Sequence, residues 1–94
     1  MQRAAFIDFA DRPVPTIEKI HNDLVARIPD VERLVSSDNG ATWQLGSRTT
    51  SLDRDMSERI IVVLVSYPET ALETALIEIA VRHGGKVREW KRGK

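Results

Sequence analysis

The run RIIVVLVS, at positions 59–66, is the feature that most restricts what this chain can fold into. The six consecutive residues from Ile60 to Val65 are all β-branched or aliphatic. Such a run is typical of a strand buried on both faces in the middle of a sheet. We therefore predict a central strand at 59–66.

Two segments have the 3.6-residue apolar period of helices that bury one face. The first is PTIEKIHNDLVARIPD, with Thr16 as its N-cap and Pro29 as its stop. The second, YPETALETALIEIAVRHGG, follows the central strand, with Pro68 in its first turn, Ser66 as N-cap and Gly84 past its end. The predicted apolar stripes are Ile17, Ile20, Leu24, Val25 and Ile28, and then Ala71, Leu72, Ala75, Leu76, Ile79 and Ala80.

Further strand signals lie near both ends of the chain. Residues 4–10, AAFIDFA, predict a first strand that Pro13 and Pro15 stop, because proline cannot donate a ladder hydrogen bond. KVREWKR, at 86–92, alternates and predicts a last strand. In it we expect one face to carry Val87 and Glu89, and the other Lys86, Arg88, Trp90 and Arg92.

The middle of the chain contains Asn39-Gly40, a strong signal for a two-residue hairpin turn. A turn centred there pairs Ser36 with Trp43 and Leu34 with Leu45. Two alternatives stay open. Residues 30–36 could extend the first helix, and residues 46–58 could be an exposed loop or a continuation of the hairpin strand through Thr50.

These elements predict a single α+β domain over residues 1–94, in the order β-α-β-β-β-α-β. Two helices would pack on one face of a mostly antiparallel sheet of four to five strands, ferredoxin-like or a variant of it. The run IPDVERLVSSDNGATW resembles the passage from helix to hairpin in ferredoxin-like domains, including small metal carriers. Those carriers need a cysteine pair, which this chain lacks, so the resemblance extends to the fold and to no function.

Composition excludes several kinds of chemistry. The chain has no cysteine, which removes disulfides and thiolate ligands or nucleophiles. No apolar run has the length of a signal peptide or a membrane-spanning helix, so we expect a cytoplasmic protein with no membrane partner. The Asp53–Asp55 spacing and the SRTTS run at 47–51 lack the glycine-shaped loops of cation and phosphate sites. We predict no metal and no cofactor.

The two histidines give no catalytic motif. His21 stands beside the apolar stripe of the first helix, and His83 closes the second, where a basic residue complements the helix dipole. Neither has a nucleophile and an orienting acid nearby in the sequence. The chain is therefore expected not to be an enzyme.

Charge is distributed unevenly, although the net charge is zero. Residues 1–81 carry eight bases and thirteen acids, whereas residues 82–94 carry six bases and one acid. Such asymmetry bears on association. It points to the C-terminal strand as the recognition surface.

We predict a partner-binding site led by Arg88, Trp90 and Arg92, followed by Arg48 and Arg54. Arginine and tryptophan are common anchors of protein interfaces. The predicted function is a small protein-binding or regulatory domain, acting through self-association as a homodimer or through a larger protein partner. Nucleic-acid binding through the same strand ranks second, since zero net charge counts against it, and a small-ligand regulatory domain ranks third. The same alternation also describes an edge strand whose charges oppose aggregation.

Overall fold

The computed structural model describes residues 3–65 and 69–92, and their side chains except those of residues 3 and 89–92. The chain forms β1 (Arg3–Asp8), α1 (Ile17–Arg27), β2 (Glu32–Ser36), β3 (Gly40–Leu45), β4 (Arg48–Asp55), β5 (Ile60–Val65), α2 (Ala71–Arg82) and β6 (Lys86–Arg92).

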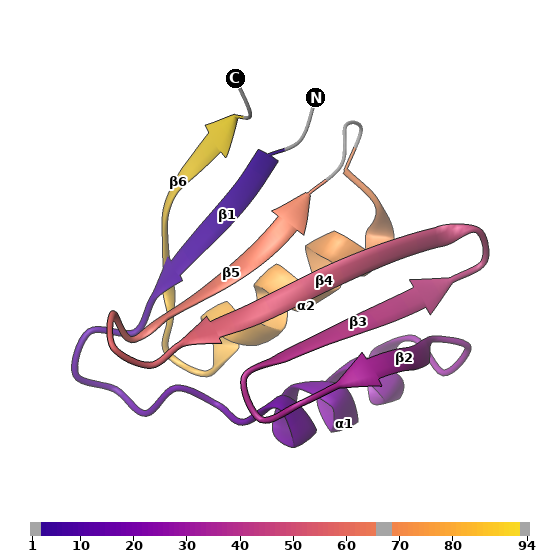
Figure 1. The fold of residues 1–94 in the computed structure, drawn as a ribbon, viewed down its shortest axis with the longest axis horizontal. Coiled ribbons are helices and arrows are strands. Elements are labelled where there is room, and N and C mark those ends of the chain that lie inside the picture. Colours follow the sequence, from indigo (N-terminus) through magenta and orange to yellow (C-terminus); the bar gives the residue numbers. More distant parts are fainter. Residues whose placement is uncertain (1–2, 66–68, 93–94) are drawn as a thin grey trace.

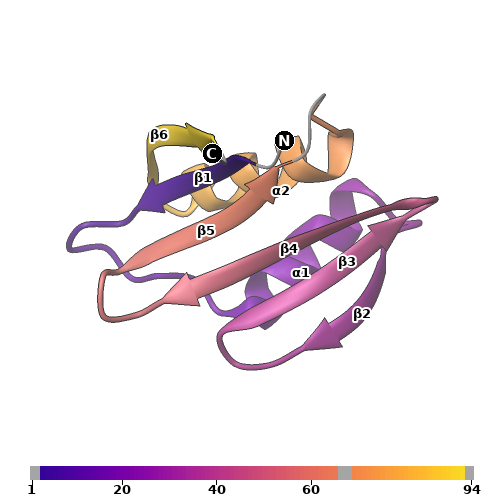
Figure 2. The ribbon, with the colours of Figure 1, turned by 45° about the horizontal axis from the view of Figure 1, so that its top comes forward.

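One antiparallel sheet holds all six of these strands, in the order β2-β3-β4-β5-β1-β6. Both helices lie on the same face of it, with α1 behind β2 and β3 and α2 behind β5 and β1 (Figures 1 and 2). The predicted α+β class is therefore confirmed. The predicted number of strands is wrong, because four strands and not three lie between the two helices in the sequence. The sheet has six strands instead of the four or five of a ferredoxin-like prediction.

The core lies between the sheet and the two helices. Alternate residues of the strands face the helices, since successive side chains of a strand point to opposite faces. Trp43 is the largest fully buried side chain, and it lies on β3. The other fully buried sheet positions are Ala5, Ile7, Leu52, Ile61, Val63 and Val65.

Helix α1 begins where its cap is predicted. The side chain of Thr16 accepts a hydrogen bond from the backbone N–H of Lys19, which satisfies one of the free donors of the first turn. Ile17, Ile20 and Leu24 are buried.

Helix α2 begins later than predicted. Its N-cap is Thr70, not Ser66, because Thr70 and Glu73 form a capping box in which each side chain satisfies the other residue's backbone N–H. Residues 66–68, which include Pro68, lie outside the described part of the chain. Gly84 follows the helix with φ of +107°, as predicted for a residue just past the end.

The β2–β3 turn is one residue earlier than the Asn39-Gly40 prediction. Ser36 pairs with Ala41, and the N–H of Ser37 donates to the carbonyl of Gly40, so Asp38 and Asn39 occupy the turn. Gly40 belongs to β3 instead, where it approaches β4 so closely that an added Cβ would lie 2.7 Å from an Asp53 carboxylate oxygen. Both predicted pairings are therefore wrong, because Trp43 pairs with Arg33 instead of Ser36 and the register shifts at Leu34.

Both alternatives left open in the middle of the chain are now decided. Residues 32–36 form a strand, so the first helix does not extend through them. Residues 46–58 are neither a loop nor a continuation of the preceding strand. They turn at Gly46, whose φ is +63°, form the separate strand β4 over Arg48–Asp55, and turn again over 56–58.

Strand β5 lies centrally, as predicted, between β4 and β1. It is not buried equally on both faces, however. Ile61, Val63 and Val65 are buried against the helices. On the other face Ile60 is buried as well, but Val62 and Leu64 are only half-buried. The reason is that both helices cover the same face.

Candidate functional site

The sheet face opposite the two helices, here called the helix-free face, is turned toward the viewer in Figure 1. Its middle carries an apolar centre, defined as Ala4 and Phe6 of β1 with Val62 and Leu64 of β5. Phe6 pairs with Val62 and Ala4 with Leu64, and all four residues are half-buried. No element in the described part of the chain covers this apolar centre from the front (Figure 2).

An acidic flank, defined as Asp53 and Asp55 of β4, borders the apolar centre on one side. Asp53 pairs with Val62 and Asp55 with Ile60, so both belong to the helix-free face, and both are exposed. The hydroxyl of Ser57 donates to the Asp55 carboxylate at 2.7 Å, and the N–H of Glu58 donates to it at 3.2 Å. These hydrogen bonds lower the pKa of Asp55 below its ordinary value, which keeps the side chain negatively charged.

A basic flank, defined as Lys86 and Arg88 of β6, borders the apolar centre on the other side. Lys86 pairs with Asp8, a residue of the helix-free face, and both flank residues are exposed. The Arg88 Nε lies 3.9 Å from a carboxylate oxygen of Asp8, at the outer limit of an ion pair. Across four neighbouring strands, the helix-free face therefore carries the acidic flank, the apolar centre and the basic flank. Two acids depart from this order, because Asp8 of β1 stands beside the basic flank and Glu89 occupies the β6 position that pairs with Phe6.

The uninterrupted alternation predicted for residues 86–92 is wrong. A bulge sets Ile7 opposite Val87 but Phe6 opposite Glu89, so Arg88 is an extra residue in β6. Lys86 consequently pairs with Asp8, whereas Trp90 pairs with Ala5. Asp8 and Ala5 are an odd number of positions apart in β1, so they belong to opposite faces of the sheet. Lys86 and Trp90 therefore pair with residues of opposite faces.

The five predicted partner-binding residues are not gathered in one place. Arg88 is exposed on β6, while the side chains of Trp90 and Arg92 on the same strand lie outside the described residues. Arg48 is exposed at the start of β4, where it pairs with Leu45 of β3. Strands β5 and β1 separate it from β6.

Arg54 is used within the fold. Its guanidinium donates to the carbonyl of Asp38 at 2.9 Å and to the carbonyl of Val14 at 3.4 Å. It thereby joins β4 to the β2–β3 turn and to the loop before α1, on the face that carries the helices.

Both histidines also join elements of the fold. The Trp43 indole N–H donates to Nδ1 of His21 at 3.1 Å, which ties α1 to β3. Nε2 of His83 lies 2.7 Å from an Asp23 carboxylate oxygen, which ties the end of α2 to α1. These contacts give both histidines a structural role.

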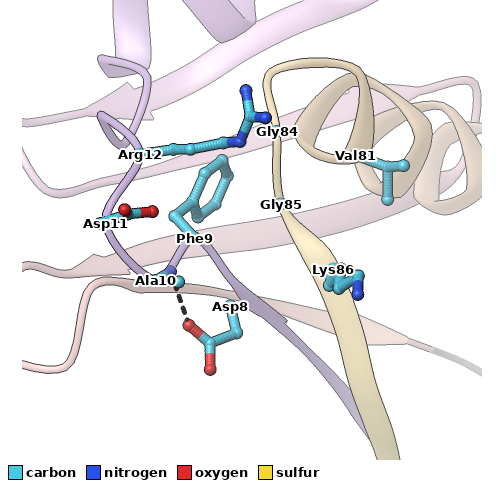
Figure 3. Close-up of a pocket in the computed structure, with 9 residues that line it drawn as sticks. All are labelled: Asp8, Phe9, Ala10, Asp11, Arg12, Val81, Gly84, Gly85 and Lys86. Carbon is cyan, nitrogen blue, oxygen red and sulfur yellow. Dashed lines mark hydrogen bonds between the residues drawn. The ribbon is translucent and has the colours of Figure 1, made fainter.

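A cleft of about 560 Å³ lies between the β1–α1 loop and the turn from α2 into β6 (Figure 3). Arg12 extends along it toward Gly84, where an added Cβ would lie 2.5 Å from Arg12 Cδ. Its charged lining has two acids, Asp8 and Asp11, and two bases, Arg12 and Lys86. This mixture gives the cleft no net charge with which to select an ionic ligand.

Among the described residues, no group of three or more His, Cys, Asp or Glu side chains could hold a metal ion. Over the same residues, no helix is long and apolar enough to cross a bilayer. No protein-family model, curated protein or solved structure matched the chain.

Sequence reasoning missed most of the helix-free face. It identified Arg88 and the basic last strand, but not the apolar centre or the acidic flank. A signal for them was present, because the predicted placement of two helices on one face of the sheet leaves the other face open. The prediction of a central strand buried on both faces did not take this into account.

Proposed function

We propose that this chain is a non-enzymatic protein-binding domain whose partner covers the helix-free face. The observation that carries the proposal is the apolar centre, which four side chains from two adjacent strands form on the face without helices. Contiguous apolar patches on small domains are commonly interaction sites. The charged flanks on either side match the polar rim that surrounds the apolar middle of protein interfaces.

The edges of the sheet favour binding through the face over strand addition. Strand β6 is one edge and carries exposed Lys86 and Arg88, and charged side chains on an edge oppose pairing with another strand. Strand β2 is the other edge, and its register shifts between Arg33 and Val35. Such bulges twist an edge away from further pairing.

The predicted role of the C-terminal strand is retained in a modified form. Arg88 and Lys86 would contribute charge at one side of the interface, not a separate binding strip. We also infer that the fold is a variant of the ferredoxin-like arrangement, in which four strands instead of two join the helices.

The test makes the β5 half of the apolar centre polar. Val62→Thr with Leu64→Thr makes the middle of the helix-free face polar, and Val81→Thr makes the same kind of change at an exposed position of α2. Tagged wild type and both variants are used to capture proteins from a lysate, with and without nuclease, and bound proteins are identified by mass spectrometry. Circular dichroism and urea unfolding establish that each variant is folded.

We expect the same proteins, which include untagged copies of this chain, to bind wild type and Val81→Thr and to be lost from the double variant. Equal capture by all three proteins would contradict the proposal. Loss of all capture on nuclease treatment would instead support the nucleic-acid alternative.

A further inference from the structure

The charges of the helix-free face are arranged with opposite signs about its middle. Going from β4 through β5 and β1 to β6, the strands contribute the acidic flank, the two halves of the apolar centre, and the basic flank. The boundary between β5 and β1 is the midline of these four strands. A rotated copy of this surface can set the apolar centre on itself and the acidic flank on the basic flank. Asp8 of β1 is the acid that departs from the pattern, and it lies beside Lys86 and Arg88 of its own chain.

The strand register aligns the charges along the strands as well as across them. Asp55 pairs with Ile60, Ile60 with Asp8, and Asp8 with Lys86. These four residues form one row across the sheet. Asp55 and Lys86 therefore stand at the same level, on opposite sides of Ile60 and Asp8, in the row next to the apolar centre.

Two identical faces can be related by a two-fold axis in one of two principal orientations. An axis parallel to the strands places β4 of one copy over β6 of the other, and Asp55 then meets Lys86 of the second copy twice per dimer. An axis perpendicular to the strands through the apolar centre places β4 over β4, and Asp53 and Asp55 then lie at the levels of Ser51 and Thr49 of the second copy. That orientation brings the acidic flank to no base, whereas the first pairs charges of opposite sign, so the first is favoured.

We propose that the partner is a second copy of this chain, packed face to face about a two-fold axis that runs along the strands. This inference rests on the proposed function, since it names the occupant of the same helix-free face. The geometry is that of aligned sheet packing, with the sheets about 10 Å apart and their strands rotated by about 30°. The same patch serves both copies, as in most homodimers.

The decisive experiment uses two charge reversals. Asp55→Lys and Lys86→Asp are purified separately, and each dissociation constant is measured by sedimentation equilibrium at low salt beside that of wild type. In each variant the two contacts become repulsive, and we expect dimerisation to weaken by about 10- to 100-fold. In a mixture of the two variants, the introduced lysine of one chain meets the introduced aspartate of the other, and the second contact keeps its native residues. A heterodimer of near wild-type affinity should therefore form.

Matched controls separate this effect from general charge and folding effects. Lys19→Asp and Asp30→Lys reverse one charge each at exposed positions of α1 and of the connection after it, and they should dimerise like wild type. Asp55→Asn removes the charge but keeps an oxygen that can accept from Ser57 and Glu58. It should weaken the dimer by about 2- to 5-fold, and urea unfolding measures separately the stability that is lost with the Asp55 charge.

Each outcome decides between the proposals. A heterodimer no stronger than either variant alone overturns the two-fold arrangement. Wild type that stays monomeric at millimolar concentration, while lysate capture still depends on Val62 and Leu64, overturns the second copy and leaves the proposed function in place. If neither capture nor dimerisation changes in Val62→Thr with Leu64→Thr, both the proposed function and the proposed dimer are overturned.

Discussion

Thr50 is a polar side chain in the core, and its hydroxyl makes no hydrogen bond with the described residues. It pairs with Trp43, it is 4% exposed, and its Oγ1 has no hydrogen-bond partner among the described residues. A buried polar atom without a partner costs stability, and replacing it with an apolar group of the same shape removes that cost.

We predict that Thr50→Val raises the free energy of unfolding by about 1 kcal/mol, as measured by urea denaturation. Thr42→Val is the matched control on the other face, because the Thr42 hydroxyl lies 2.9 Å from that of Ser51. It should lower the free energy of unfolding by about 0.5–1 kcal/mol. Destabilisation by Thr50→Val would show that the hydroxyl has a partner.

Asp55 makes folding depend on pH in a defined direction. Its pKa is lowered in the folded state by the hydrogen bonds from Ser57 and Glu58. The stabilisation is therefore present above the unfolded carboxyl pKa of about 3.9 and is lost as pH falls through the lower, folded pKa.

Ser57→Ala removes the hydroxyl donor, and we expect the pKa of Asp55 to rise toward its ordinary value. NMR titration of the side-chain carboxyl carbon measures this directly. Ser47→Ala, at an exposed serine in another turn, should leave the Asp55 titration unchanged. An unshifted Asp55 pKa in Ser57→Ala would assign the effect to the backbone N–H groups alone.

At the scale of elements, α2 begins at the stronger of two nearby capping signals. Ser66 and Pro68 match the usual start of a helix, yet the helix begins at Ala71. Thr70 and Glu73 satisfy each other's backbone N–H groups, and Glu73 is 2% exposed, so this cap is also packed into the fold.

Thr70→Ala should therefore lower the free energy of unfolding by about 1 kcal/mol, measured by urea or thermal denaturation. Thr74→Ala is the same substitution four residues later, inside the helix, where alanine is the better helix former. The Thr74 hydroxyl contacts the Glu69 carboxylate at the surface, so its removal should change stability by less than about 0.5 kcal/mol. Equal effects at the two positions would contradict the capping role.

At the scale of the whole molecule, a face-to-face dimer couples folding to concentration. A second copy that binds only the folded chain stabilises it by mass action. The thermal midpoint of wild type should rise by about 5 °C over a roughly hundredfold increase in protein concentration. The midpoint of Val62→Thr with Leu64→Thr should stay constant over the same range, and a constant wild-type midpoint would argue for a monomer.

The sequence by itself determined the class of fold and the existence of its periodic elements. Ile60–Val65, the stripe from Ile17 to Leu24 and the Thr16 cap are local patterns, and each depends on neighbours a few residues away. The basic flank on the last strand was readable for the same reason. Local chemistry determines such features before any distant contact forms.

The tertiary structure alone decided the turn at Asp38 and Asn39, the extra residue at Arg88 and the partial exposure of the apolar centre. Gly40 belongs to β3, where it pairs with Asp53 of β4, and this is a contact between strands. The acidic and basic flanks come to border one apolar centre only because β1 inserts between β5 and β6. These are long-range pairings, and no periodicity within one segment specifies which partner that segment will meet.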